Sequence, residues 1–479
     1  MRQIDCTYLL NGKDVENNQT IEIEGERIRS LSSSTATSKS RVLVMPALVN
    51  AHDHGRAVRT SSIGGSGKPL ETWLHYLALF PAVDPYLAAA VALGNSALGG
   101  AGIVMMHYTR AQGFTDLPTE VAEVARAARD VGVRVGFAVS MKDRNPIGYG
   151  PPEPLLAALP QAAREEIVSR FIRPPMAPKD LIKLVDDVAA AADGPHFNVQ
   201  YGPNGVQWCS DALLQAISEA SALSGRRVHM HLLETRYQRG YLDQLYGGDV
   251  VKFLDSIGLL SERLTLAHCV WARPDELELL AARGVTISTN SSSNLKLRSG
   301  VAPAAKMLSC GCRVAMGIDG GALDDDDDML RELRLTHLLH LGSGFTPKVS
   351  ESDMLSVAAK TGRFSVTNSA AGGIIEPGAP ADLLLLDYDA LDDDHLRDDI
   401  DPVDLVFARA TAGHMSELIV AGRTIVRDRR VLGIDLEAAR REVMLRMREG
   451  QPAMAPFAAA LSQLDRAIAE QMERQFSCA

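Results

Sequence analysis

The sequence predicts an α/β protein: a (β/α)₈ barrel, the TIM barrel fold, carrying a small β-sandwich domain built from both ends of the chain. Two observations predict it. Strand-like and helical segments alternate from residue 46 to about residue 342, and short strands occur before residue 46 and again after about residue 375. We therefore expect a composite β-sandwich domain over 1–45 and 375–433, a barrel over 46–374, and a C-terminal helical extension over 434–479.

The N-terminal segments have the alternation typical of half-buried strands. Asn11-Gly12 is a hairpin signal, residues 21–23 alternate apolar and acidic side chains, and residues 41–45 form another extended run. The Ser- and Thr-rich stretch 32–40 is expected to be a surface loop.

Eight apolar segments form the predicted barrel, with helices between them such as 119–131 and 211–224. Alternation of this kind is typical of parallel sheets, and eight units close economically into a barrel. An open doubly wound sheet is the alternative, but no glycine-rich phosphate-binding fingerprint follows the first strand. The predicted strands are residues 48–51, 103–107, 133–139, 197–201, 228–232, 264–267, 285–288 and 314–317.

Strand signals return near the C-terminus, at residues 381–387, 403–408, 417–420 and 424–426. We expect them to join the N-terminal strands, because neither set alone makes a good core. Residues 434–472 have helical spacing broken at Pro452 and Pro456. This tail either packs on the rest of the chain or makes an oligomer contact.

Composition narrows the class of protein. The chain has 479 residues, with 49 Lys and Arg against 60 Asp and Glu, and a net charge of −11. No basic stripe stands out, so neither a nucleic-acid nor a membrane partner is expected. The apolar stretch 87–106 contains Asn and Gly and fits a helix followed by a strand better than a membrane span. Without a signal-peptide pattern or a disulfide framework, we expect a cytoplasmic protein.

Reactive groups in a parallel barrel lie at the carboxyl ends of its strands. His52 and His54 follow the first strand, and side chains two apart on a strand point the same way. His231 and Glu234 close the fifth strand, with His229 on the same face and one layer deeper. Taken singly, each histidine could equally be a hydrogen-bonded core residue.

Two further strands end in residues of the same type. His268 ends the sixth strand, and Asp319 ends the eighth, where a buried carboxylate is costly unless it meets a cation or donors. Asn294, in the loop after the seventh strand, could shape a pocket. Three imidazoles and one carboxylate suit Zn²⁺ or another divalent transition metal, which would acidify a water. The joint pattern indicates a metal-assisted hydrolase.

These motifs resemble the amidohydrolase superfamily. The similar segments are Pro-x-Leu-x-Asn-x-His-x-His at 46–54, His-x-x-Glu at 231–234, His268 and Gly-x-Asp-Gly at 317–320. Residues 376–382 (Glu-Pro-Gly-x-x-Ala-Asp) are similar to the return into the β-sandwich domain. The nearest branch contains cytosine-deaminase-like enzymes, triazine hydrolases and methylthioadenosine deaminases.

The resemblance implies one divalent transition metal per subunit, with zinc favoured over iron, held by His52, His54, His231 and Asp319. It also implies that His268 bonds the hydrolytic water, that Glu234 carries a proton to a ring nitrogen of the substrate, and that Asp319 takes the water proton. No lysine ends the fourth strand, so the two-metal arrangement built on a carboxylated lysine is not supported.

The chain departs from this branch in two loops. Asp324 and Asp325 stand where relatives often have an Asn pair. One interpretation is a solvated acidic loop. The other is a loop that faces the pocket, where its charge would favour a cationic or donor-rich substrate. The loop 202–209 lacks the histidine of nucleoside-type relatives, which makes an adenosine-like substrate less expected. There, Gln207 and Trp208 could supply an amide and a stacking plane for a flat substrate.

We therefore expect a hydrolase acting on a C–N bond, with deamination of an amino-substituted N-heterocycle as the leading hypothesis. The alternative is hydrolysis of an amide-like bond in a urea, carbamate or anilide. A non-catalytic assembly protein is disfavoured, because such relatives lose metal ligands and none is missing here. The expected partners are a small-molecule substrate and further copies of the chain in a homo-oligomer.

Overall fold

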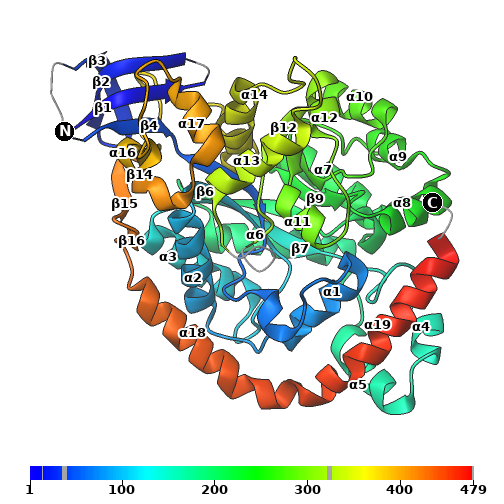
Figure 1. Cartoon of the computed structure of the whole chain (residues 1–479). Helices are drawn as coiled ribbons and strands as arrows, with labels where there is room; N and C mark the ends of the chain where they lie inside the picture. The colour runs from blue at the N-terminus through cyan, green and yellow to red at the C-terminus, as the bar shows by residue number, and fades with distance from the viewer. Residues whose placement is uncertain (13, 35–39, 321–325, 477–479) are drawn as a thin grey trace.

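The computed structural model describes residues 1–12, 14–34, 40–320 and 326–476, which fold around two eight-stranded sheets (Figure 1). One sheet is parallel and has the strands in sequence order from β5 to β12. These strands coincide with the eight predicted ones, so the α/β barrel prediction is confirmed. Their bounds are β5 (Leu48–Asp53), β6 (Ala101–Tyr108), β7 (Arg134–Met141), β8 (Phe197–Pro203), β9 (Val228–Leu232), β10 (Leu264–His268), β11 (Thr286–Thr289) and β12 (Arg313–Met316).

The barrel closes where the last strand, β12, meets the first, β5, and hydrogen bonds of the site residues join the two strand ends. The Asp319 N–H donates to the His52 carbonyl at 2.9 Å, and the Ile318 N–H donates to the Asn50 side chain at 3.0 Å. A Cβ at Gly317 would lie 2.6 Å from the His52 nitrogen, so only glycine allows this approach. The closure therefore brings the end of β12 against the end of β5.

Helices cover the outside of the barrel (Figure 1). The predicted helices 119–131 and 211–224 are α3 and α7, and the stretch 87–106 is α2 followed by β6, as predicted. Among the described residues, none of the helices has the length and apolar character needed to span a bilayer. The α-helices from α1 to α15 are α1 (Leu70–Tyr76), α2 (Pro85–Leu98), α3 (Leu117–Val131), α4 (Glu153–Ala157), α5 (Gln161–Phe171), α6 (Pro178–Ala192), α7 (Asp211–Ser224), α8 (Arg236–Tyr246), α9 (Val250–Ser256), α10 (Pro274–Ala282), α11 (Ser291–Lys296), α12 (Ala304–Ser309), α13 (Met329–His340), α14 (Glu351–Leu355) and α15 (Gly362–Thr367).

The second sheet is built from both ends of the chain, which confirms that expectation. Its strand order is β16-β15-β14-β13-β4-β1-β2-β3, so all eight strands belong to one hydrogen-bonded sheet in which β4 pairs with β1 and β13. The domain boundaries stay a prediction. The strands are β1 (Arg2–Asn11), β2 (Asp14–Glu24), β3 (Arg27–Ser33), β4 (Val42–Pro46), β13 (Leu383–Asp387), β14 (Met415–Val420), β15 (Arg423–Arg427) and β16 (Arg430–Val431).

The structure departs from the prediction for one segment and describes only part of another. The predicted strand 403–408 is wrong: the segment is helix α17 (Pro402–Arg409). The Asp401 side chain accepts from the Val403 N–H and Pro402 occupies the first turn, so capping and proline geometry favour a helix over the β-branched composition. In the predicted loop 32–40, Ser32 and Ser33 belong to β3, and residues 35–39 lie outside the described residues.

A buried ion cluster joins the barrel to the second sheet. Asp382, just before β13, accepts from Arg134 of β7 at 3.1 Å and from Arg363 of α15. Its other oxygen accepts from the Ala421 N–H at 2.7 Å. Although burial by itself raises the pKa of Asp382, the two guanidinium groups outweigh it and hold the pKa below its ordinary value.

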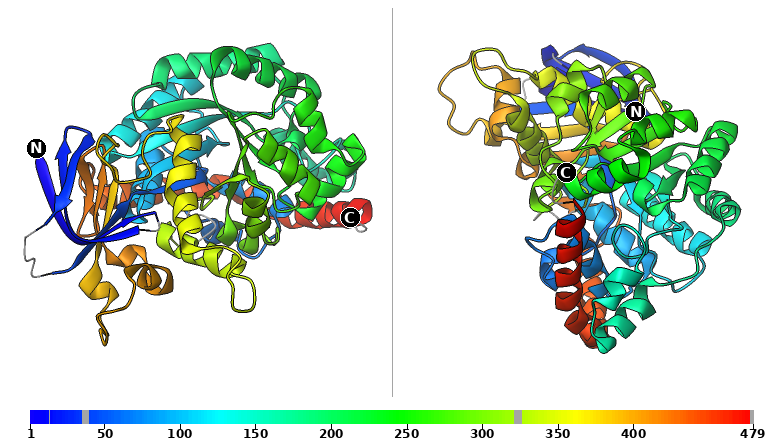
Figure 2. Two further views of the ribbon diagram at one scale, coloured as in Figure 1. Left: turned by 90° about the horizontal axis from the view of Figure 1, so that it is seen from above. Right: turned by 90° about the vertical axis from the view of Figure 1, so that its right-hand side faces the viewer.

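The C-terminal tail folds back onto the same chain. Helix α18 (Leu436–Gly450) is followed by a 3₁₀ turn containing Pro452 and by α19 (Ala455–Phe476), as the proline positions predict. Figure 2 shows α19 at the opposite end of the molecule from the N-terminal strands. Its buried face packs with residues around α4 and α5; the members from α19 include Phe457, Leu461, Leu464, Ile468 and Met472. The tail is therefore part of the packing of this chain.

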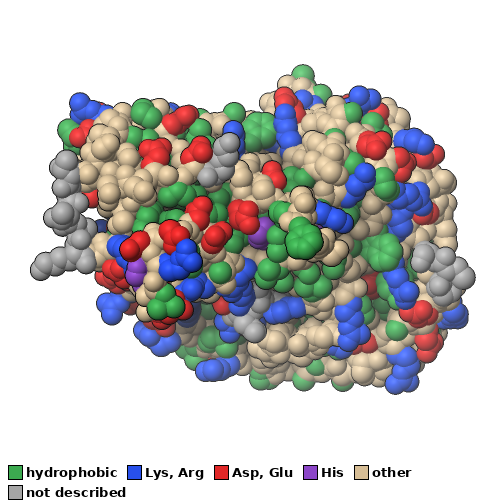
Figure 3. All heavy atoms as spheres, turned by 45° about the horizontal axis from the view of Figure 1, so that its top comes forward, with side chains coloured by type: hydrophobic (Ala, Val, Ile, Leu, Met, Phe, Trp, Pro, Cys, Tyr) green, Lys and Arg blue, Asp and Glu red, His purple; other side chains and the backbone are tan. Residues whose placement is uncertain are grey.

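The charged surface has no broad stretch of one sign on the face drawn in Figure 3, where acidic and basic side chains are interspersed. This agrees with the balance of charges in the sequence.

Candidate metal centre and active site

Three histidines at the carboxyl ends of β5 and β9 turn the same ring nitrogen toward one point. His54 donates from Nδ1 to the His107 carbonyl at 2.8 Å, and His231 has its Nδ1 2.6 Å from the Asn204 carbonyl. His52 has its Nδ1 2.8 Å from Nε2 of the deeper His229. With Nδ1 held in each ring, Nε2 is left as the free coordinating atom.

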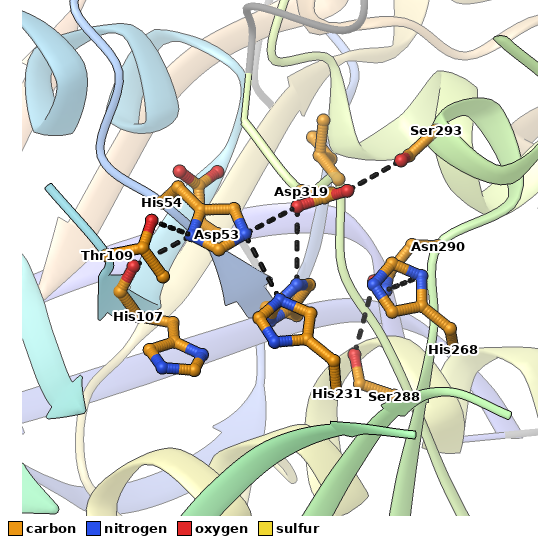
Figure 4. Close-up of polar contacts among 12 residues, drawn as sticks. Asp53, His54, His107, Thr109, His231, His268, Ser288, Asn290, Ser293 and Asp319 are labelled. Carbon is orange, nitrogen blue, oxygen red and sulfur yellow. Dashed lines mark hydrogen bonds and ion pairs between the residues drawn. The ribbon is translucent and has the colours of Figure 1, made fainter. Parts of the chain in front are cut away.

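Asp319 completes this group. Its Oδ1 lies 3.3 Å from Nε2 of His52 and 3.1 Å from Nε2 of His54, while Oδ2 accepts from the Ser293 hydroxyl at 2.6 Å. Figure 4 shows Asp319 beside His54 and above His231. Burial raises the pKa of Asp319, but its contacts with His52 and His54 hold it well below the ordinary value. The carboxylate of Asp319 is therefore charged.

The donor set fits a divalent metal. Nε2 of His52 and Oδ1 of Asp319 are buried and have no hydrogen-bond partner among the described residues. The ligand atoms of His52, His54 and Asp319 lie within 4.8 Å of one another. Burial lowers the pKa of His52 to about 3 and that of His231 well below its usual range, so both rings keep a free lone pair at neutral pH. Imidazole and carboxylate donors in this number suit zinc or a similar ion.

His268 and Glu234 lie beside the donor set. His268 donates from Nδ1 to the Asn294 amide oxygen at 2.9 Å, and its Nε2 is 3.6 Å from Oε2 of Glu234. Burial first, and then the charges of Asp319 and Glu71, raise the pKa of Glu234 well above its usual value. A buried carboxyl group beside His268 is the kind of group that carries protons in general acid–base catalysis.

Backbone strain is concentrated at these residues. His268 and Asp319 have φ values of 76° and 67°, and Leu233, next to Glu234, has a φ of 51°. Side chains other than glycine rarely adopt this left-handed region, and such conformations persist where surrounding contacts enforce them. Here these left-handed conformations change the direction of the chain just after β9, β10 and β12, next to Glu234, His268 and Asp319.

A cavity of about 290 Å³ opens over the donor set. Its walls include aromatic and aliphatic side chains from α1 and from the loops after β7 and β8. The aromatic members are Trp73, Tyr149, Phe171 and Trp208, and the charged or titratable ones are His54, Arg56, Glu71, His75, Arg110, Lys142, His231, Glu234, His268 and Asp319. Arg56 lies 4.9 Å from the centre of the Trp73 ring and donates to the Asp319 carbonyl. Aromatic walls together with a few polar groups are typical of sites that bind small molecules.

The structure brings together six of the predicted residues: His52, His54, His231, Glu234, His268 and Asp319. Of the remaining four, Trp208 lines the cavity, whereas Gln207 and Asn294 are fully buried and are not among the described residues that line it. Asn294 lies in α11 behind His268. Asp324 falls outside the described residues.

Sequence reasoning missed Glu71, Lys142 and Tyr149, which all line the cavity. Glu71 lies in the first turn of α1, where an acidic residue is ordinary for a helix, so nothing local distinguishes it. Lys142 follows β7, one of the strands that carry no predicted ligand, and Tyr149 lies in a long loop. Only the fold shows that these residues share a cavity.

Comparison with known proteins identifies the family. The sequence profile of the Amidohydrolase family matches residues 43–425. The chain is 28% identical over 413 residues to a 5-methylthioadenosine/S-adenosylhomocysteine deaminase of Thermococcus sibiricus, covering 86% of this chain and 88% of that protein. It is 29% identical over 427 residues to a 5'-deoxyadenosine deaminase of Methanosarcina barkeri, covering 87% of this chain and 90% of that protein.

Solved structures share the fold. Atrazine chlorohydrolase TrzN of Arthrobacter aurescens TC1, complexed with zinc, superposes with a TM-score of 0.77 at 22% identity over 93% of this chain and 100% of that one. Guanine deaminase from C. acetobutylicum with bound guanine superposes with a TM-score of 0.70 at 16% identity, over 89% of this chain and 100% of that one. The family profile and the metal-ligating geometry agree, and the chain belongs to the amidohydrolase family as a hydrolase that acts on C–N bonds with a divalent metal.

Proposed function

We propose that this enzyme deaminates an amino-substituted N-heterocycle, with zinc as the metal held by His52, His54, His231 and Asp319. The observation that carries the proposal is the position of Glu234: a buried carboxyl group with a raised pKa lies 3.6 Å from His268 in a cavity with aromatic walls. The deaminase names of the relatives and the zinc in a structural neighbour support it.

When bound, a divalent ion supplies a water whose pKa is lowered to about 7. The residues of the chain then have separate tasks. His268, with Nδ1 held by Asn294, presents Nε2 to the attacking water. Asp319 would accept the first proton of the water, and protonated Glu234 gives its own proton to a ring nitrogen. The Glu234 carboxylate then takes the second proton from the attacking oxygen and passes it to the leaving amino group, and the proton on Asp319 restores Glu234. One water and one C–NH₂ group beside a ring nitrogen become a C=O group, a ring N–H group and ammonia.

The cavity fits a substrate of this class. Its volume of about 290 Å³ is at the lower end of ligand pockets, which span roughly 300–1,000 Å³. Trp73 and Trp208 offer planar surfaces for stacking, and Glu234 faces the polar edge of the ring. Zinc is favoured over iron because three imidazoles and one carboxylate suit it, although the donor set also admits iron.

Ammonia release tests the proposal. Purified enzyme with its metal would be incubated with aminopyrimidines, aminopurines, pterins and aminotriazines, and ammonia would be measured against a metal-depleted control. We expect ammonia from at least one ring class, and only with metal. Amine release from arylureas or anilides, with no ammonia from any ring, would contradict deamination and favour amide-bond hydrolysis.

Replacing His268 by Asn tests the division of tasks at the site. Because His268 is proposed to hold the water and not the metal, His268→Asn is expected to keep its metal content while kcat falls about 10²-fold or more. Metal analysis of the purified variant and steady-state kinetics check both parts. Loss of metal from this variant would mean that His268 is a ligand.

A further inference from the structure

One acidic side chain of the cavity has no task in the proposed reaction. Glu71 lies in α1, is only 3% exposed, and lines the same cavity as His54, His231 and Glu234. It contacts the site through Thr235, the residue that follows Glu234 and caps α8. A carboxylate in this position is costly to bury without a compensating interaction.

The two oxygens of Glu71 have different surroundings. Oε1 accepts from the Thr235 hydroxyl at 2.5 Å and from the Tyr149 hydroxyl at 2.9 Å. Oε2 is buried and has no hydrogen-bond partner among the described residues. Two donors thus fix the carboxylate plane and leave one acceptor unsatisfied, and buried acceptors without a partner are rare in folded proteins.

The basic groups of the cavity do not satisfy this oxygen. Arg56 donates to the Asp319 carbonyl, and Arg110 donates to the Phe80 carbonyl. Burial lowers the pKa of His75 to about 4, so this ring is neutral at pH 7. The nearby Arg236, whose charge acts on Glu71, forms its ion pair with Glu473, and among the described residues no salt bridge reaches Glu71. Oε2 is therefore left for a hydrogen-bond donor of the bound ligand.

We propose that Glu71 is a specificity-determining residue: its Oε2 accepts a hydrogen bond from a second N–H group of the substrate, so the enzyme prefers heterocycles with two amino groups over those with one. The inference rests on the proposed function and names its substrate class. Glu234 serves the reacting edge of the ring, and Glu71 binds a donor elsewhere on the ring.

Matched ligand pairs test this inference. Adenine is compared with 2,6-diaminopurine, and 4-aminopyrimidine with 2,4-diaminopyrimidine. Binding to the metal-loaded enzyme is followed by stopped-flow quenching of tryptophan fluorescence, which reports binding before turnover. The additional hydrogen bond to Oε2 makes the diamino member bind up to about 10-fold more tightly in at least one pair.

The variant Glu71→Gln keeps the shape of the side chain. Because Thr235 and Tyr149 donate to Oε1, the amide oxygen takes that place and the NH₂ group takes the place of Oε2. A donor then faces the donor of the ligand, so the preference for the diamino member is lost or reversed. Glu153→Gln, at an exposed position of α4, is the control and keeps the wild-type preference.

If the wild-type enzyme binds the monoamino and the diamino member equally well in both pairs, the inference is overturned. This test does not depend on whether Glu71→Gln folds. An unchanged preference in folded Glu71→Gln also overturns it. Ammonia release is measured in parallel: ammonia with no diamino preference contradicts the role of Glu71 alone, whereas the preference without ammonia supports that role and contradicts the proposed deamination.

Discussion

Replacing Glu234 by Gln is expected to lower kcat by about 10²–10⁴-fold, the usual contribution of a general acid–base group, while leaving the metal content unchanged. Glutamine has nearly the same shape but cannot carry a proton to a ring nitrogen. The carboxyl group is suited to this task because burial, Asp319 and Glu71 raise its pKa well above the usual value. Steady-state kinetics with the best substrate of the panel, together with metal analysis, measure both quantities.

The pattern of the kinetic change separates proton transfer from substrate binding. Loss of proton transfer lowers kcat with little change in KM, whereas loss of a ground-state contact raises KM. Glu153→Gln, exposed on α4, is the matched control and should keep full activity. If Glu234→Gln loses its metal, or retains wild-type kcat, the proposed role of Glu234 is wrong.

Replacing Asp382 by Asn is expected to lower the free energy of unfolding by about 3–5 kcal/mol, because it leaves two buried guanidinium groups without their counter-charge. The side chains of Arg363 and Asp382 are each only 4% exposed, and that of Arg134 is 10% exposed. The three come from β7, α15 and the segment before β13, so the change weakens the junction between barrel and sheet. Thermal and urea unfolding measure the loss.

An exposed ion pair provides the control for this experiment. Lys183 and Asp187 are 71% and 48% exposed, so Asp187→Asn should change stability by less than about 1 kcal/mol. Equal losses in Asp187→Asn and Asp382→Asn would contradict the importance of the buried cluster.

The same cluster predicts how stability depends on pH. The pKa of Asp382 is lower in the folded protein than in the unfolded chain, so folding is favoured more strongly when the group is ionised. Its contribution is complete above the unfolded value of about 4 and is lost as the pH falls through the lower folded value. Wild-type stability should therefore decline on acidification below about pH 4, and Asp382→Asn should show a shallower decline.

Much of the architecture could be predicted from local patterns. The alternation of apolar strands with helices predicted all eight barrel strands, because the spacing of apolar residues that marks a strand or a helix lies within a short window of sequence. The strand predicted at 403–408 was wrong because two local signals conflict there. The β-branched composition favours a strand, the capping signals of Asp401-Pro402 favour a helix, and the segment forms a helix.

The candidate site could be predicted in part for a topological reason. A parallel barrel places the carboxyl ends of all its strands at one rim, so residues as distant as His52 and Asp319 meet once the strands are assigned. The positions of Gln207 and Asn294 could not be predicted in this way, because a loop residue can face the cavity or lie behind it at the same place in the sequence.

The amino-acid sequence by itself determined the parallel barrel and the order of histidines and carboxylates along it, since periodicity and strand ends are local properties. Only the tertiary structure decided that Nδ1 of His54, His231 and His268 is held by groups from other elements, and that Glu71 shares a cavity with Glu234. These features depend on contacts between residues far apart in the chain, such as Glu71 with Thr235, and no short window of sequence contains both partners.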